Sequence, residues 1–241
     1  MVRFFVTPEE LDGESLTLSG ENAQHAKVLR LKVNEEVLVC DGAGREALCR
    51  ITEAGNWTLS REDVRESSSE AAVQVRVYLA FPKADKLEHV IQKATELGAY
   101  EVIAFPSARC VSKPDEKSLK KKLERWQKIA ASAAEQSGRG RIPSIRVLPS
   151  YSAALKEAAQ SDKALLFYEN EHAVTLKMAL TTSPYRTVSL VTGPEGGLEE
   201  AEVEQARAAG LQVCTLGKRI LRCETAPLCA LSAVMYDAGE F

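Results

Sequence analysis

Two stretches near the carboxyl terminus constrain the fold more than any other part of this sequence. Each predicts a short apolar strand, a tight glycine turn and then a helix, in residues 188–198 (VSLVTGPEGGL) and residues 211–226 (LQVCTLGKRILRCETA). Gly196 and Gly197 allow the backbone a positive φ or a close approach to a ligand, and Gly217 ends the second strand. Two such units in a row predict a parallel α/β sheet that binds its ligand at the carboxyl ends of the strands.

The two loops indicate a function only when they are taken together. GPEGG is not G-x-G-x-x-G, the chain contains no G-x-x-x-x-G-K-[ST], and a single loop of this kind is more often an ordinary turn. In this order, however, GPEGG and LGKRILRCETA closely resemble the cofactor loops of the SPOUT methyltransferases. More narrowly, they resemble the family that methylates uracil N3 in the 16S RNA of the small ribosomal subunit.

The resemblance implies a fold and a cofactor. The fold is a SPOUT-type parallel α/β sheet with a C-terminal trefoil knot, although the periodicity of the sequence by itself indicates no knot. The cofactor is S-adenosyl-L-methionine. The matching loop positions that would bind it are Thr192, Gly193, Glu195, Gly196, Gly197, Leu216, Gly217, Ile220, Leu221 and Arg222. Two positions depart from the family's usual wording: GGLE stands in place of GGFS, and Cys223 replaces a small residue without a thiol.

Arg222 is the candidate catalytic residue. Methyl transfer from a sulfonium is an in-line displacement that requires no metal, so the protein must chiefly align acceptor and methyl group. Uracil N3 has to lose its proton, and a cation near O2 or O4 favours the resulting anion. Arg222 can supply this cation or grip a nearby phosphate; the alternative is an ion pair with a neighbouring glutamate. No residue stands out as the base.

Composition limits the cellular setting and the partners. With 241 residues, 45% hydrophobic and 27% charged, the chain is typical of a soluble protein of one large or two small domains. It lacks a run of about eighteen apolar residues and a signal peptide, so we expect a cytoplasmic protein without a membrane partner. The six cysteines form no C-x-x-C pair, so no metal site is expected. The net charge of −3 means that RNA binding must come from local patches.

Residues 1–70 predict a small β-rich domain. Short strands around glycine turns, including a hairpin about residues 41–44 (DGAG), predict a little barrel. The order of RFF, HAKVLR and the DGAG hairpin resembles the PUA-like domain that precedes the SPOUT domain in the same family. Residues 66–72 (ESSSEAA) have no periodic apolar face and predict a linker to an α/β methyltransferase domain in residues 71–241.

Seven residues are candidates for RNA contacts. They are Arg3, His25, Arg30, Arg109, Gln136, Arg139 and Arg141. For His25 and Arg30, a partly buried histidine and a surface arginine with no RNA role are about equally good readings. Residues 118–137 predict a helix with an apolar side and a basic side, and such a basic side is usually only solvated. Its continuation AEQSGRGR enters a glycine-rich loop and resembles the family's segment near the RNA.

The resulting hypothesis is S-adenosylmethionine-dependent methylation of a uridine N3 in small-subunit ribosomal RNA, either naked or within the 30S subunit. Two alternatives stay open: a SPOUT enzyme that acts on tRNA or on a ribose 2′-OH, and a non-catalytic RNA-binding assembly factor. Two intact glycine loops argue against the second alternative. Residues 226–237 predict a helix that is apolar almost all round and must be buried within a domain or against a partner. Since SPOUT enzymes pair through the knotted region, the resemblance implies a homodimer.

Overall fold

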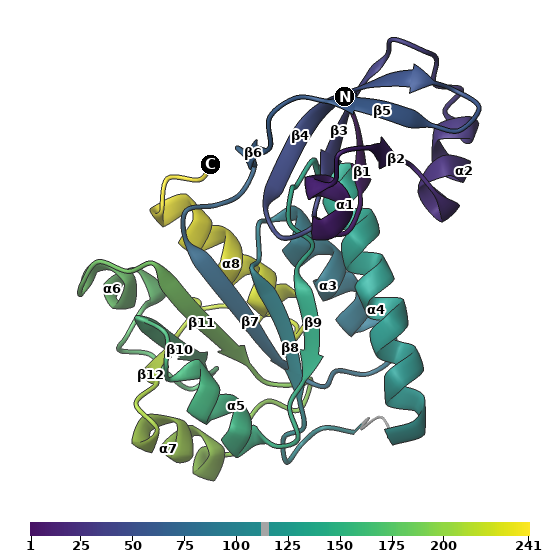
Figure 1. Ribbon diagram of the computed structural model, residues 1–241. Coiled ribbons are helices and arrows are strands. Elements are labelled where there is room, and N and C mark those ends of the chain that lie inside the picture. The colour runs from purple at the N-terminus through teal and green to yellow at the C-terminus, as the bar shows by residue number, and fades with distance from the viewer. Residues whose placement is uncertain (112–115) are drawn as a thin grey trace. The chain divides into compact units, whose positions relative to one another are not determined.

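The computed structural model describes residues 1–111 and 116–241, and the chain divides into two units (Figure 1). The first unit comprises Met1–Glu70 together with Ala134–Ile142, and the second comprises Ala71–Ala133 together with Pro143–Phe241. The segment Ala134–Ile142 therefore joins the first unit, although its sequence position puts it within the predicted second domain. No helix in the described part of the chain is long and apolar enough to cross a membrane.

The first unit is built on one sheet with the strand order β1-β3-β4-β5-β2, and β6 pairs with β4. The strands are β1 (Val2–Phe5), β2 (Leu16–Thr17), β3 (Glu36–Cys40), β4 (Arg45–Glu53), β5 (Thr58–Arg61) and β6 (Arg65–Glu66). The predicted barrel is corrected to a curled half-barrel (Figure 1), because the end strands β1 and β2 do not pair with each other within the described residues. The predicted hairpin is confirmed, since β3 pairs antiparallel with β4 on either side of DGAG.

Two short helices complete the core of the first unit. They are α1 (Pro8–Asp12) and α2 (Gly20–Val28). Helix α1 starts where it does because Thr7 and Glu10 form a reciprocal capping box and Pro8 tolerates the first turn. Leu11 of α1 and Ala26 of α2 are fully buried and pack with the apolar face of the sheet.

The second unit contains an all-parallel sheet with the order β12-β10-β11-β7-β8-β9, as the sequence predicts. Its strands are β7 (Gln74–Ala80), β8 (Glu101–Phe105), β9 (Ser144–Val147), β10 (Lys163–Phe167), β11 (Thr187–Thr192) and β12 (Gln212–Cys214). Its helices are α3 (Lys86–Glu96), α4 (Glu116–Ser137, whose last turn belongs to the first unit), α5 (Tyr151–Ala158), α6 (Leu176–Thr181), α7 (Glu200–Ala208) and α8 (Thr225–Asp237).

Helices cover both faces of this sheet. Tyr78 and Phe105 pack with α5 and α7 on one face, whereas α8 packs on β7 and β11 and contacts α3. Strands covered on both faces read as continuous apolar runs, and every residue of β8 is buried. In β7, Tyr78 and Ala80 are as buried as Val77, so this strand is covered on both faces as well.

Helix α8 is covered by its own chain on one side only. Leu231 and Val234 are fully buried, whereas Cys229 is exposed and Tyr236 keeps 75% of its surface accessible. An apolar pattern around a whole helix does not therefore require burial on every side. The side of α8 that carries Cys229 and Tyr236 is therefore open in the second unit.

Candidate functional site

A cavity of about 660 Å³ lies at the carboxyl ends of β10, β11 and β12. These three strands are neighbours in the sheet, so the loops that follow them meet at one edge (Figure 1). The cavity is lined by residues 167–169 after β10, by residues 192–195 and 197–198 after β11, and by residues 215–223 after β12. All the residues predicted to bind the cofactor line it, except Gly196.

The GPEGG loop turns sharply because of Gly197. This residue has φ +69°, and its N–H donates a 2.9 Å hydrogen bond to the carbonyl oxygen of Pro194. A Cβ atom on Gly197 would clash with the Glu169 carboxylate, which lies against this turn. Gly196 does not line the cavity, and its carbonyl accepts a 3.0 Å hydrogen bond from Arg109 Nη1.

The second glycine loop runs from Thr215 to the start of α8. Gly217 has φ +105°, and its N–H donates to Thr215 Oγ1 at 3.2 Å. The Arg222 carbonyl accepts hydrogen bonds of 2.9 Å from the N–H groups of Thr225 and Ala226, which begins the helix. The Arg222 side chain is exposed at the cavity and pairs with no carboxylate of the described residues. The alternative interpretation of Arg222, an ion pair with a neighbouring glutamate, is therefore not seen there.

Lys86 holds the glutamates next to Arg222 instead. Its Nζ lies 3.0 Å from Glu195 Oε1 and 3.2 Å from Glu224 Oε2. Burial alone would raise the pKa of Glu195, but the hydrogen bond from the Lys83 N–H and the Lys86 ammonium lower that pKa to about 2. Burial raises the pKa of the Cys223 thiol to about 12, so this thiol is protonated at neutral pH.

Several residues that line this cavity are not predicted as site residues from the sequence. They are Lys86, Phe167, Tyr168, Glu169, His172 and Cys223. Each follows the carboxyl end of a parallel strand or begins the next helix, which is the position where such folds bind ligands. That signal becomes usable only when the strand order is known, because the sequence does not show that β10 lies between β11 and β12.

Six of the seven candidate RNA residues belong to the first unit, whereas Arg109 belongs to the second. Residues 136–141 thus join Arg3, His25 and Arg30 in one body. His25 Nδ1 lies 2.9 Å from Glu135 Oε1, and the backbone of Arg141 forms β-bridges with the DGAG hairpin. Arg30 and Gln136 are exposed.

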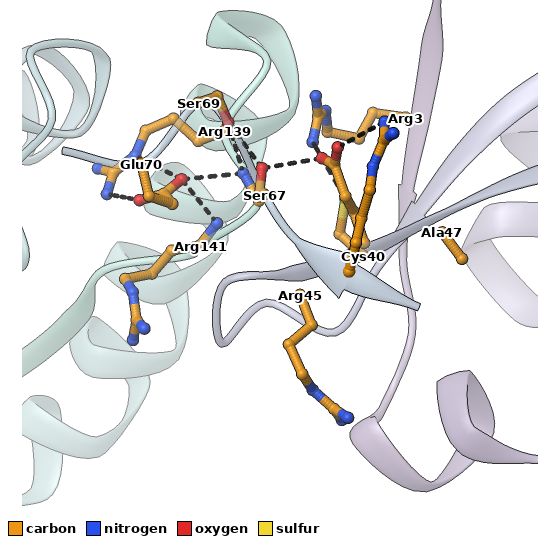
Figure 2. Close-up of polar contacts among 12 residues, drawn as sticks. Arg3, Cys40, Arg45, Ala47, Ser67, Ser69, Glu70, Arg139 and Arg141 are labelled. Carbon is orange, nitrogen blue, oxygen red and sulfur yellow. Dashed lines mark hydrogen bonds and ion pairs between the residues drawn. The ribbon is translucent and has the colours of Figure 1, made fainter. Parts of the chain in front are cut away.

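Arg3 and Arg139 are buried in a polar network, which Figure 2 shows. Arg139 Nη2 lies 2.6 Å from Glu70 Oε2, and Arg3 Nη1 lies 2.8 Å from Glu46 Oε2. Ser67 Oγ donates to Glu46 at 2.8 Å and lies 2.9 Å from Ser69 Oγ. The Gly140 N–H donates to both Ser69 and Glu70, which connects the two pairs. The stretch predicted as a linker is therefore tied down at Ser67 and Glu70. Both arginines would have to leave carboxylate partners before they could contact a phosphate.

Comparisons with known proteins agree with these features. The family described as "RNA methyltransferase domain" matches residues 69–235, and the family described as "RNA methyltransferase PUA domain" matches residues 18–56. The chain is 38% identical to the ribosomal RNA small subunit methyltransferase E of Bacillus subtilis, over 98% of this chain and 97% of the relative.

Two solved structures carry the cofactor. The ribosomal RNA small subunit methyltransferase E of Neisseria gonorrhoeae, bound to S-adenosyl methionine, is 32% identical, with a TM-score of 0.84 over 98% of this chain and 97% of that one. A methyltransferase of Legionella pneumophila in complex with the same cofactor is 29% identical, also with a TM-score of 0.84 and the same coverage. The two matched domains and the full-length relatives show that this chain belongs to the RNA methyltransferase family, among the ribosomal RNA small subunit methyltransferases E.

Proposed function

We propose that this protein methylates N3 of a uridine in small-subunit (16S) ribosomal RNA and takes the methyl group from S-adenosyl-L-methionine. The observation that carries the proposal is the cavity in which both glycine loops meet, in a chain 38% identical to a ribosomal RNA small subunit methyltransferase E. The free 30S subunit and naked ribosomal RNA are both possible substrates. Because the 30S subunit and its RNA occur where ribosomes are, we infer that the protein works in the cytoplasm.

The cavity fits the cofactor. Its volume of about 660 Å³ lies within the range of small-molecule sites, and its walls combine apolar side chains with open backbone groups of the glycine loops. Leu216 and Leu221 offer surfaces to an adenine ring, and the neighbouring peptide groups can hydrogen-bond to its edge. When bound, S-adenosyl-L-methionine supplies an activated methyl group on a positively charged sulfur.

The chain's own contribution is alignment and charge. The glycine loops after β11 and β12 hold the donor in place, and alignment of this kind contributes up to about 7–11 kcal/mol in well-oriented reactions. Arg222 lines the cavity with an exposed guanidinium, so it can lie against O2 or O4 of the uracil and favour loss of the N3 proton.

The RNA is bound by groups of the first unit in this proposal. The main candidates are the exposed Arg30 and Gln136 and the half-buried Arg141 and His25, whereas Arg3 and Arg139 hold the unit together. Arg109 holds the GPEGG loop through the Gly196 carbonyl and can still reach RNA with its exposed end.

We further propose the trefoil knot and the homodimer that the SPOUT resemblance implies. The open side of α8, with Cys229 and a Tyr236 that is 75% exposed, supports a self-pairing surface. Light scattering tests the dimer: Tyr236→Asp should shift the wild-type dimer toward monomer. A second tyrosine, Tyr100, is not a suitable control position, because its ring lies under the Arg76 guanidinium. Lys177→Asp, on the exposed surface of α6, is the better control and should leave the dimer intact. A monomeric wild type that is fully active would exclude the dimer.

The decisive experiment combines genetics and mass spectrometry. Nucleosides of 16S RNA from a strain that lacks this protein should lose 3-methyluridine at one position, and purified protein with labelled cofactor should restore it. Transfer RNA and 2′-O-methyl nucleosides from the same strains serve as internal comparisons. Loss of a tRNA or ribose methylation would favour the other SPOUT activity, and no loss at all would favour the assembly factor.

A further inference from the structure

A single ammonium group joins three segments at the edge of the cofactor cavity. Lys86 is the first residue of α3 and follows β7, Glu195 lies in the loop after β11, and Glu224 directly precedes α8. The Lys86 Nζ lies 3.0 Å from Glu195 Oε1 and 3.2 Å from Glu224 Oε2. Both carboxylates belong to the loops that carry the cofactor residues, so Lys86 connects these loops to each other and to the start of α3.

The surroundings strengthen this connection. Glu195 Oε1 also accepts a 2.9 Å hydrogen bond from the Lys83 N–H, which fixes the carboxylate to the β7–α3 segment. The Cys223 thiol donates to Glu224 Oε2 at 3.2 Å. The three charged side chains are between 21% and 27% exposed, so solvent screens their interaction less than at an open surface.

The Lys86 ammonium is surrounded by partners from its own chain. An ammonium has three protons, and its neighbours here are Glu195, Glu224 and the Cys223 sulfur at 3.7 Å. Lys86 also lines the cavity, so its ammonium faces two carboxylates of the chain beside the space for the ligand. A contact between Lys86 and the cofactor's carboxylate would compete with these two ion pairs.

We propose that Lys86 is a positioning residue, a clamp that holds the two glycine loops at the spacing that the cofactor needs without binding the cofactor itself. The inference rests on the proposed cofactor role of the cavity. Without the ammonium, the carboxylates of Glu195 and Glu224 face each other uncompensated, and like charges this close repel. The loops then move apart, and the contacts of both loops with the adenosine part of the ligand are lost together.

Calorimetry with two ligands tests the clamp. S-adenosylmethionine carries an amino-acid group, whereas 5′-methylthioadenosine lacks it and presents only the adenosine part. Lys86→Met should weaken the binding of both ligands by about tenfold, the loss expected for one charge-assisted interaction. Lys86→Arg should recover part of the affinity for both. Lys93→Met is the matched control, because Lys93 lies on the same helix and its ion pair within the described residues is local, with Glu96 at 2.8 Å.

Two further variants separate the clamp from a direct contact. Glu195→Gln should weaken both ligands, and in the Lys86→Met background it should restore part of the affinity because it removes one uncompensated carboxylate. If Lys86 instead binds the cofactor's carboxylate, Lys86→Met weakens S-adenosylmethionine alone and Glu195→Gln restores no affinity in the Lys86→Met background. That result, or unchanged affinities in a folded Lys86→Met protein, overturns the clamp. A wild-type protein that binds neither ligand refutes the proposed function of the cavity itself.

Discussion

Replacement of Arg139 by methionine should destabilise the first unit and leave RNA binding by the folded protein little changed. The side chain of Arg139 is 5% exposed and that of its partner Glu70 is 16% exposed. Loss of one partner of a buried ion pair costs about 3–5 kcal/mol, because the other charge stays buried without compensation. Glu70 keeps hydrogen bonds of 2.9 and 3.0 Å from the N–H groups of Gly140 and Arg141. We therefore expect the lower end, about 3 kcal/mol.

The two tryptophans make this loss measurable in one unit. Trp57 lies in the first unit and Trp126 in the second, and they are the two tryptophans of the sequence. In a Trp126→Phe background, fluorescence during urea unfolding reports on the first unit. The double variant Arg139→Met, Glu70→Gln should recover part of the lost stability, because the uncompensated carboxylate is gone.

Salt dependence of RNA binding separates structure from contact. Arg141→Ala should lower the slope of log affinity against log salt by about one, as expected for one lost phosphate contact. Arg139→Met should leave that slope unchanged at temperatures where the protein stays folded. A stable Arg139→Met protein with a lower slope would refute the structural role and reinstate Arg139 as a phosphate contact.

Three other changes test the cavity. Gly197→Ala should weaken S-adenosylmethionine binding by at least about tenfold in calorimetry, because φ +69° is strained for alanine and the new Cβ would meet Glu169. Arg222→Ala should lower the single-turnover methylation rate by about a hundredfold while the cofactor Kd stays near wild type, and a changed Kd with an unchanged rate would contradict its role at the acceptor. Glu195 should stabilise the fold above pH 4.5 and lose this contribution as the pH falls toward 2, because folding lowers its pKa; the unfolding free energy of Glu195→Gln should therefore fall less steeply over that range in urea titrations.

Local patterns in the sequence predict local structure well. The DGAG turn between residues 36–40 and the next strand is confirmed as a hairpin, because Asp41 Oδ1 accepts hydrogen bonds from the N–H groups of Ala43 and Arg45. The glycine turns predicted after β11 and β12 are also present, and Gly197 and Gly217 have a positive φ in them. In each case the residues that fix the backbone lie within a few positions of one another.

Pairings across the chain could not be predicted in this way. Arg3 and Arg139 look like exposed basic residues in the sequence, yet their carboxylate partners Glu46 and Glu70 lie far away along the chain. Neither composition nor periodicity says which distant acid a base will meet. The same limit explains why Lys86 is missed, since its two partners come from loops more than a hundred residues later.

Long-range pairing also fixes the RGR stretch, residues 139–141, in the first unit. Gly140 has no side chain, and a Cβ atom there would lie 2.5 Å from Ser67 Oγ. The stretch can therefore pack against residues 66–72, which the sequence predicts as a linker, only with glycine at this position. That close approach brings the Gly140 and Arg141 N–H groups onto Glu70 and buries the side chain of Arg139. Gly140 and Arg139 therefore fasten the segment to the first unit. The half-buried Arg141 is the arginine of the stretch best suited to reach RNA.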